Sequence, residues 1–480
     1  MTDTTTDPAH LTFTATTDAV GTHPPPEPAN KSLPAWYQML SSSTDALSGH
    51  HKKWTVKMCM PFGDALKSGW LLKAPTDIEF TNHPDDDRVH ASVPSTETDS
   101  DNVVTTFPVD QPDREGNSAF LLPNAVINTQ WEIQTPDGYS ALVVPPINRS
   151  EERFTSLGLF AETDTETGVF ELPILVERTP VMIEEGDPIA QIIPIKRSTL
   201  LDDPVIDSYS PDSKMGKIKH HFERFNDVRV GFYRNELWTP KPGGRNFTSY
   251  DAFQDHVSMD ADSQATVDDR PDLVEEDRPF LPDDAKHVFY CREKFNEAVP
   301  KPKPAETHIP DGYGEALRDL GLGTETHPTA KWAMDAMELG YIVELDRPLH
   351  ISRDPENGFD AFHAENEGEN SFHQHVPEKI GDAHRFSPME ILNVFSQWSV
   401  VMEHGYSNFY SSPINHFQRD HRSFSGIVDA DWYQGEVNIP GKFTERSDEA
   451  TLSRGAAITQ AIPLQRDALL QYAVINDNDT

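Results

Sequence analysis

The chain repeats itself, and this repeat limits its possible folds more than any other feature. The segment 138–140 (GYS) recurs at 405–407, 267 positions later. At the same spacing, Trp131, Pro146 and Asn148 match Trp398, Pro413 and Asn415. Ordered matches at one spacing are the signature of an internal duplication. We therefore expect one module to be built twice.

Further matches extend the repeat toward both ends of each copy. They lie 269 positions apart near the end of the copies and 271 positions apart near the start. The shared types are turn-forming glycines, prolines at strand ends and core aromatics, and they contain no obvious catalytic set. The positions that we expect to hold the architecture are Gly69, Trp131, Gly138, Tyr139, Pro146, Asn148, Gly186 and Gln191 in copy 1, and Gly340, Trp398, Gly405, Tyr406, Pro413, Asn415, Gly455 and Gln460 in copy 2.

Each copy has the sequence pattern of a β protein. Residues 126–195 consist of short apolar runs that glycine and proline interrupt at short intervals, a pattern typical of a sandwich or barrel. One short helical segment is predicted over residues 62–67. The sequence thus predicts a mainly β protein with two tandem sandwich-like modules.

The remaining segments have no such pattern. Residues 1–50 are rich in Thr, Pro, Asp and Ser, and we expect a disordered acidic tail there. Copy 1 covers residues 51–200, with an exposed acidic insertion at about 84–117, and copy 2 covers residues 330–480. Residues 201–329 form a long irregular connector, with a short helix near 215–226 and an acidic run at 251–284.

The charge of the chain narrows its partners and its setting. Asp and Glu number 79 against 40 Lys and Arg, a formal net charge of −39. A polyanion such as nucleic acid would be repelled. Acidic residues spread along the whole chain favour a protein from a high-salt environment, where screening acts within roughly 3 Å at 1 M salt. An acidic protein of an ordinary environment is the alternative.

Cysteine content and hydropathy indicate the cellular location in which we expect the protein. The two cysteines, Cys59 and Cys291, are too few for a disulfide framework and are expected to be free thiols. No apolar stretch reaches the roughly 18 residues that span a bilayer, and no secretory signal is visible at the start. We therefore expect a soluble protein made in the cytoplasm, with no membrane partner.

Two motifs of copy 2 resemble those of a known enzyme superfamily. Residues 425–440 (SGIVDADWYQGEVNIP) and 452–462 (LSRGAAITQAI) resemble two motifs of the trimeric dUTPases and dCTP deaminases. The resemblance implies a β-clip fold and a trimer. It implies that Asp429 helps to activate the attacking water and that Trp432 or Tyr433 stacks on the sugar. An enzyme of this kind would use Asp429, Tyr433 and Gln460.

Several departures from the superfamily pattern argue against catalysis. One extra residue lies between Asp429 and Gly435, and copy 1 has Ala161 or Glu162 where the aspartate should be. The phosphate-binding Arg-Ser-Ser element is missing, with its nearest trace at residues 148–150 (NRS). No glycine-rich segment near the end of the chain closes a site. We interpret the motifs as a β-clip with a decayed or absent site.

A second resemblance covers each module in full. Residues 54–80 begin WTVKMCMPFGDALKSGW, and residues 183–197 read IEEGDPIAQIIPIKR. Together with the GYS strand, these segments resemble a family of uncharacterised proteins of tailed phages and prophages. That resemblance implies a viral context and no activity.

A histidine-rich segment offers a weak metal site. His363, His373 and His375 lie within AFHAENEGENSFHQH, where the H-x-H pattern can bind a metal ion. Copy 1 has only the acidic insertion at this place, so we favour a solvated loop. We expect no metal and no cofactor.

These observations favour a building block over an enzyme. We expect a virion structural protein of a tailed, haloarchaeal virus, a capsid decoration or turret protein in preference to a tail part. Its partners would be its own copies, as a trimer, and other virion proteins such as the major capsid protein. One alternative is a dUTPase-like or dCTP-deaminase-like nucleotide hydrolase. Another is a non-catalytic tail or glycan-binding module.

Overall fold

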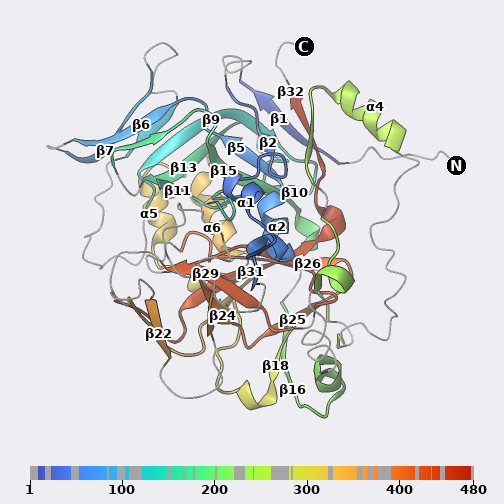
Figure 1. The fold of residues 1–480 in the computed structure, drawn as a ribbon. Helices are drawn as coiled ribbons and strands as arrows, with labels where there is room; N and C mark the ends of the chain where they lie inside the picture. The colour runs from blue at the N-terminus through green and yellow to red at the C-terminus, as the bar shows by residue number, and fades with distance from the viewer. Residues whose placement is uncertain are drawn as a thin grey trace.

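Figure 1 shows the protein in a computed structural model. The structure describes residues 9–16, 23–44, 53–83, 86–94, 103–107, 122–149, 153–165, 168–176, 179–200, 203–220, 233–241, 243–260, 281–282, 285–322, 328–353, 360–364, 372–375, 391–416, 421–433, 435–443 and 449–476. Strands dominate, so the prediction of a mainly β protein is confirmed.

Module 1, the upper half of Figure 1, contains three sheets formed largely by copy 1. The first has the order β11 (Phe154–Ser156), β13 (Val169–Val176), β9 (Ala125–Gln134), β1 (Leu11–Ala15), β32 (Tyr472–Asn476) and β17 (Arg245–Phe247), with β8 (Val104–Thr106) also on β9. The second has the order β12 (Leu159–Ala161), β10 (Tyr139–Val144), β15 (Pro188–Lys196), β5 (Trp70–Lys73) and β2 (Glu27–Pro28). The third joins β14 (Val181–Ile183), β6 (Ile78–His83) and β7 (Asp86–Ser92).

Module 2, the lower half of Figure 1, contains four sheets formed largely by copy 2. One has the order β19 (Lys303–Pro304), β20 (Tyr341–Glu344), β31 (Ala457–Gln465), β26 (Tyr406–Ser411) and β28 (Gly426–Val428). Another joins β23 (Phe372–His375), β24 (Ile391–Phe395), β29 (Asn438–Phe443) and β27 (His421–Ser423). The last two are β22 (Asp360–Ala364), β21 (Leu349–Arg353) and β30 (Glu449–Leu452), and β16 (Val205–Tyr209), β18 (His287–Arg292) and β25 (Ser399–Met402).

The described helices are short. They are α1 (Ala35–Met39), α2 (Met60–Lys67), α4 (Tyr250–Asp260), α5 (Tyr313–Asp319) and α6 (Thr329–Glu338). Single turns occur at η1 (Val56–Met58), η3 (Arg197–Thr199), η4 (Tyr233–Leu237), η6 (Glu293–Phe295), η7 (Ala305–His308) and η9 (Arg466–Ala468), and a separate hairpin joins β3 (Ser43–Thr44) to β4 (Lys53–Trp54). Helix α2 confirms the helix predicted over 62–67. Residues 214–220 are helical, as predicted, while 221–226 lie outside the described residues.

The two modules share an apolar interior. One cluster of buried side chains contains equivalent pairs from both copies, such as Leu142 with Phe409 and Ile193 with Ile462. Helix α2 of copy 1 packs on β28 of copy 2, and α6 of copy 2 packs on β12 of copy 1. Because each contact occurs a second time with the copies exchanged, the modules are related by an approximate twofold axis.

Two asparagines repeat this reciprocity in hydrogen bonds. Asn148 donates to the carbonyl of Ser425 at 2.8 Å and accepts from its amide at 2.8 Å. Asn415 makes the same pair of bonds with Gly158, at 2.9 and 2.7 Å. Both asparagines have positive φ, +54° and +59°, which their type tolerates better than most. Each module therefore holds the other through the same loop.

The modules also exchange strands. The last strand of copy 2, β32, lies parallel to β1 in the first sheet of module 1, and Figure 1 shows this red strand beside the blue one. The corresponding strand after copy 1, β16, lies parallel to β18, which pairs with β25 of copy 2. Each module is completed by the other copy's final strand.

Three predicted regions differ from expectation. Part of the predicted disordered tail is ordered: residues 11–15 form the buried strand β1, because Leu11 and Phe13 fill the core of module 1, and residues 27–28, 35–39 and 43–44 form β2, α1 and β3. Residues 86–92 and 104–106, which we placed in an exposed insertion, form β7 and β8, and Val89 and Val104 are buried. The region 201–329 is not only a connector, since β16, β17 and β18 join the sheets of both modules.

Candidate functional site

The carboxylate that carries the enzyme-like motif lies at the end of β28. Asp429 is fully buried, with a side-chain exposure of 0%. Its Oδ1 accepts hydrogen bonds from Lys241 Nζ at 2.5 Å and from Ser407 Oγ at 2.7 Å. Its Oδ2 accepts the backbone N–H of Thr239 at 2.8 Å, and Arg466 Nη1 lies 3.6 Å from Oδ1. Both oxygens of the carboxylate are thus occupied by protein groups.

The electrostatics of Asp429 follow from these partners. Burial by itself would raise the pKa of this carboxyl. The charges of Lys241 and Arg466, with the hydrogen bonds from Lys241 and Thr239, outweigh burial and hold the pKa below its usual value. Asp429 is therefore ionised at neutral pH and compensated by cations of the protein itself.

A segment from outside both copies covers this carboxylate. Lys241, whose side chain is only 4% exposed, also lies 3.3 Å from Asp64 Oδ2 on helix α2. Trp238 Nε1 donates to the same Asp64 oxygen at 2.7 Å. Burial raises the pKa of Asp64, against the lowering effect of Lys241. Residues 233–241 therefore connect the Asp429 motif of copy 2 to the first helix of copy 1.

The aromatic residues of the motif are covered by the same segment. The ring of Tyr433 meets that of Tyr233 edge to face, with centroids 5.4 Å apart, and Tyr433 Oη donates to the carbonyl of Glu436 at 3.2 Å. Burial raises the pKa of Tyr433 to about 12. Trp432 is buried, at 5% exposure. Trp432 is thus enclosed, and Tyr433 is partly buried against Tyr233.

Gln460 holds a helix to a strand. Its Nε2 donates to the carbonyl of Leu339 at 2.6 Å, just after α6, and its Oε1 accepts the N–H of Ile414 at 2.8 Å. Gln191 makes the equivalent bonds in copy 1, to Ser68 and from Ile147, at 2.6 and 3.0 Å. Since both copies use the glutamine in the same way, the geometry gives it a structural role.

An Arg–Asp ion pair also occurs once in each copy, buried in copy 2 and partly exposed in copy 1. Arg197 binds Asp164 in copy 1 and Arg466 binds Asp431 in copy 2, each at 2.5 Å. In both copies the aspartate accepts the N–H of the repeated glycine, Gly138 or Gly405. The other repeated glycines and the tryptophans have structural positions as well. Gly69, Gly186, Gly340 and Gly455 have positive φ, and Trp131 and Trp398 are buried, with Tyr139, Tyr406, Pro146 and Pro413 in the adjoining strands and loops.

The copies differ at the position of the motif carboxylate. Counting back 267 positions from Asp429 leads to Glu162, which is 40% exposed and pairs with Lys331 at 3.0 Å. Copy 1 thus lacks the buried cluster. Lys241, Thr239 and Trp238 were missed by sequence reasoning, because they lie far from the motif in the chain and match no pattern.

The histidines are not gathered by the described fold. His363 lies on β22, whereas His373 and His375 lie on β23, and these strands belong to different sheets. Their side chains, together with Glu365 and Glu369, fall outside the described residues. Within the described part of the chain, no group of three potential metal ligands occurs. The prediction of a solvated loop in preference to a metal site at these histidines therefore stays a prediction.

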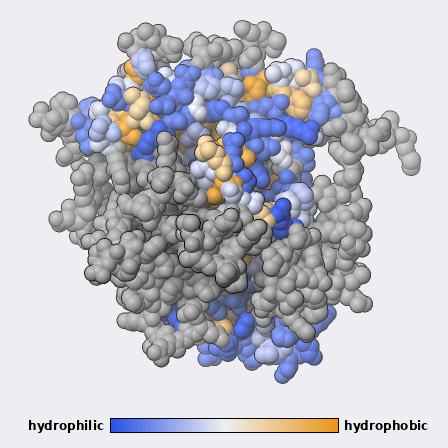
Figure 2. All heavy atoms as spheres, in the orientation of Figure 1, coloured by the Kyte–Doolittle hydropathy of each residue, from blue (hydrophilic) through white to orange (hydrophobic). Residues whose placement is uncertain are grey.

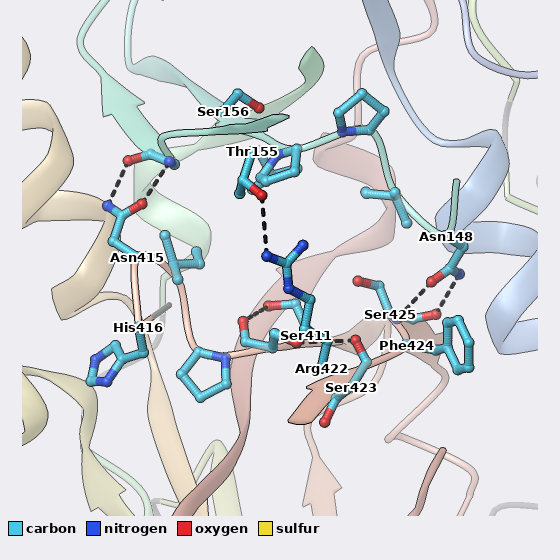
Figure 3. A pocket seen from close by; sticks show the side chains of 18 of the residues that line it. Asn148, Thr155, Ser156, Ser411, Asn415, His416, Arg422, Ser423, Phe424 and Ser425 are labelled. Atoms are coloured by element: carbon cyan, nitrogen blue, oxygen red, sulfur yellow. Dashed lines mark hydrogen bonds between the residues drawn. The ribbon is translucent and has the colours of Figure 1, made fainter. Parts of the chain in front are cut away.

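A pocket lies between the modules. It is close to the start of β28, whereas Asp429 and the segment that covers it lie at the other end of this strand. It is a cavity of about 180 Å³ lined by both copies, including Thr155 on β11 and Arg422 on β27 (Figure 3). Arg422 Nη2 donates to Thr155 Oγ1 at 3.2 Å. The repeat could have indicated this place, since positions 155 and 422 match at the spacing of 267 and differ in charge.

Comparison with known proteins returned distant structural likenesses. No family model and no curated protein matches the chain. An EIAV dUTPase matches at 12% identity and a TM-score of 0.16, over 25% of this chain and 88% of that one. A 2'-deoxycytidine 5'-triphosphate deaminase from Agrobacterium tumefaciens matches at 8% identity and a TM-score of 0.27, over 89% of this chain and 93% of that one. The two motifs of copy 2 resemble the same two kinds of enzyme. The comparisons give no support to a phage or prophage family.

Proposed function

We propose that this protein is a non-catalytic building block of a larger assembly. The observation that carries the proposal is the surroundings of Asp429, where four protein groups occupy or neutralise the carboxylate. A general base must reach the water that it activates within hydrogen-bond distance. At 0% exposure, with Lys241 and Thr239 above it, Asp429 has no such access.

The particular assembly that we propose is a virion, with the protein as a capsid decoration or turret. The support is the sequence resemblance to phage proteins and the acidity of the chain, which suits concentrated salt. The described part of the face in Figure 2 is mainly hydrophilic, with small separate apolar areas. Quantitative mass spectrometry of purified virus particles would find the protein at a fixed, high copy number. Its absence from particles would contradict the proposal.

We propose further that the chain assembles as a trimer through faces outside the module interface. Three two-module subunits would place six similar modules around one axis, a symmetry suited to local threefold positions of a capsid. Mass measurement in concentrated salt would give three times the mass of one chain. A strict monomer under those conditions would contradict the trimer.

None of the described helices is long and apolar enough to cross a membrane.

A nucleotide hydrolase is the second candidate, and one observation favours it. The cover over Asp429 comes from residues 233–241, which belong to neither copy, so opening this segment would leave Asp429, Ser407 and Arg466 in place. Incubation with dUTP and dCTP in the presence of magnesium tests it. The building-block proposal expects no turnover above that of Asp429→Asn. Turnover that this substitution abolishes would overturn it.

Glycan binding finds little support in the described surface. A sugar site on a cell-surface binding protein needs exposed aromatic rings. Among the described residues, Tyr250 is the one aromatic that ranks with the exposed large hydrophobic side chains, at 42% exposure. A single ring offers no platform for a sugar chain. Binding of the protein to a glycan array, abolished by Tyr250→Ala, would reverse this view.

A further inference from the structure

Two helix pairs occupy equivalent places in the two modules, α1 with α2 and α5 with α6, and Figure 1 shows both pairs at mid-height of the molecule. Strand β2 precedes α1 and pairs with β5, and β19 precedes α5 and pairs with β20 in the same register. Residues 28–40 therefore correspond to 304–316, and the repeat likewise makes 57–68 correspond to 328–339. Folding alone would permit the same surface charge in both modules.

The surface charge of these segments instead has opposite sign in the two modules. Residues 28–40 and 57–68, which we call the basic face, contain three lysines and one aspartate, a net charge of +2. Residues 304–316 and 328–339, the acidic face, contain five acidic residues and one lysine, a net charge of −4. The exposed side chains that give the faces their sign are Lys31, Lys67, Glu306, Asp311, Glu315 and Glu338.

The intervening residues do not cancel this difference. Over the whole stretch 28–68 the chain contains five lysines and two aspartates, a net charge of +3. Over 304–339 it contains seven acidic residues against one arginine and one lysine, a net charge of −5. The reversal therefore holds for both stretches as wholes.

One position shows the reversal most directly. Lys67 ends α2 and Glu338 ends α6, at the same place in the repeat, and both side chains are exposed. A lysine in the last turn of a helix interacts favourably with the helix dipole, whereas a glutamate there does not. Partial burial, and then the charges of Asp335 and Glu306, raise the pKa of Glu338. The acidic face is thus not the arrangement that would best stabilise its own module.

The basic face also carries an exposed apolar side chain. Met39 on α1 is 78% exposed, the largest fraction among the exposed large hydrophobic residues that the structure describes. Lys57 Nζ donates to the carbonyl of Gln38 at 3.0 Å, which puts a cation beside Met39. In the acidic face, Ile309 and Met334 are only partly buried. An apolar centre within a polar rim is the usual anatomy of a protein–protein contact.

A second copy of this chain is the partner that fits the basic face. The chain has a net charge of −39, so its copies repel each other unless a contact brings opposite charges together. Among the described residues, Lys31 and Lys67 on the basic face form no ion pair. Within the same described part of the chain, Glu306, Asp311 and Glu315 on the acidic face form none either. Both sets are thus available to opposite charges on a neighbour.

We propose that the basic face of one copy binds the acidic face of a second copy, with Met39 at the centre of the contact. The two surfaces differ, so the contact is heterologous and passes from copy to copy, and a rotation that closes gives a ring. This inference rests on the proposed homo-oligomer, and it names the surfaces through which a ring of three would form. Two basic faces or two acidic faces would repel each other, which excludes a symmetric pairing of like faces.

The test reverses one face at a time in the full chain. Lys31→Glu with Lys67→Glu leaves two acidic faces, and Glu306→Lys with Glu315→Lys leaves two basic faces. Each double variant should self-associate at least about tenfold more weakly than the natural chain, because like charges replace exposed ion pairs at two positions. Sedimentation velocity over a dilution series at one salt concentration measures the mass and the dissociation constant. Circular dichroism checks that each variant is folded, as expected for exposed side chains.

Recombining the faces distinguishes this contact from a damaged protein. The two double variants, mixed in equal amounts, should bind each other and form complexes with an even number of chains, because one variant has only acidic faces and the other only basic ones. A chain with all four substitutions has exchanged faces and the natural net charge. It should regain the mass of the natural assembly.

Matched substitutions outside the faces serve as controls. Lys217→Glu with Lys286→Glu changes the net charge by the same amount at exposed lysines, and assembly should be retained. Met39→Glu introduces the residue found at the equivalent position 315 and should weaken self-association severalfold. Met182→Glu, at the 42% exposed methionine of β14, should leave self-association unchanged.

The outcomes separate this contact from the proposed trimer. A trimer that either face variant leaves intact, or that the control at Lys217 and Lys286 disrupts equally, would overturn the contact and keep the trimer. Failure of the two variants to bind each other in the mixture would also overturn the contact. An assembly of another size that dissociates on face reversal would overturn the trimer and keep the contact. A natural chain that stays monomeric at every concentration would contradict both.

Discussion

At the scale of single residues, equivalent positions of the two copies have different physical roles. Asp429 and Glu162 are equivalent by the repeat, yet one is sealed among cations and the other pairs with Lys331 at the surface. Breaking a buried ion pair leaves uncompensated charge, whereas an exposed pair contributes little. The same substitution should therefore have different effects in the two copies.

Asp429→Asn should lower the free energy of unfolding by about 3 kcal/mol. Lys241 and Arg466 would lose one counter-charge, but Asp64 and Asp431 remain beside them, which keeps the loss moderate. Urea denaturation measures it. The control Glu162→Gln should cost no more than about 1 kcal/mol. Equal losses would show that the cluster around Asp429 adds no stability.

A buried histidine makes a pH-dependent prediction. His287 is 2% exposed, neither ring nitrogen has a hydrogen-bond partner, and burial lowers its pKa to about 3. The unfolded chain takes up this proton near pH 6.5, so stability present above that pH is lost as the pH falls toward 3. Strand pairing puts Leu11 at the equivalent place in module 1.

His287→Leu should stabilise the protein at pH 7, because two unpaired polar atoms leave the core. Its advantage over the natural chain should grow by about 3 kcal/mol between pH 7 and pH 4. Urea denaturation at both pH values measures it. The reverse change, Leu11→His, should introduce the same acid sensitivity into module 1. An advantage that does not change with pH would contradict the lowered pKa of His287.

At the scale of elements, the exchanged strands make the stability of each module depend on residues of the other copy. Val474 on β32 is 1% exposed within module 1, although it belongs to the end of copy 2. Its counterpart Val205 on β16 is 42% exposed. Both strands complete the other copy's module, but only β32 is covered on both sides, by β1 and by β17.

Val474→Ala should lower the free energy of unfolding by about 2 kcal/mol. The destabilised region should be module 1. Hydrogen exchange should show reduced amide protection in β1 and β9, with β31 of copy 2 less affected. The matched substitution Val205→Ala should change the free energy of unfolding by no more than about 0.5 kcal/mol. Loss of protection confined to copy 2 would contradict the strand exchange.

Two equivalent glycines directly precede β5 in copy 1 and β20 in copy 2. Gly69 and Gly340 have φ of +67° and +68°, and an added Cβ would lie 1.8 Å from the carbonyl oxygen of Ile192 and 2.1 Å from that of Ala461. Alanine at either position should cost clearly more than the ~1–2 kcal/mol of the backbone conformation alone. Gly138→Ala is the control, with φ of +80° and open space around it. Thermal denaturation would show the ranking, and equal costs would contradict it.

At the scale of the whole molecule, the modules depend on each other. The shared interior contains side chains of both copies, Asn148 and Asn415 hold each module's loop to the other, and each module takes a strand from the other copy. Each module has an apolar cluster of its own, and a third cluster, with side chains from both copies, joins them. We expect the chain to fold as one cooperative unit.

Calorimetry of the full chain should therefore show one transition, with calorimetric and van't Hoff enthalpies equal. A chain that ends at residue 200 should not fold by itself, because it lacks β32 and exposes the face that covers copy 2. Circular dichroism and amide dispersion in proton spectra would show this. Two separate transitions, or a folded fragment, would contradict interdependence.

The sequence by itself determined the duplication, the mainly β class, the helix at residues 62–67 and the positions of the repeated turns. These follow from local rules, such as glycine at positive φ and short apolar runs between turns, which act over a few residues. It also placed the motif carboxylate at Asp429 in copy 2 alone. It did not predict order at residues 11–15 or 86–92, because polar composition there concealed residues that the core buries.

Only the tertiary structure decided what surrounds Asp429, which copy each final strand completes, and where Arg422 lies. These depend on contacts between residues far apart in the chain, such as Lys241 with Asp429 or Ala473 with Leu11, which no local pattern encodes. Burial then changes the chemistry, because a carboxylate that would be reactive in water becomes part of a neutralised core when cations enclose it. The repeat thus specified the modules, and their packing specified what each residue can do.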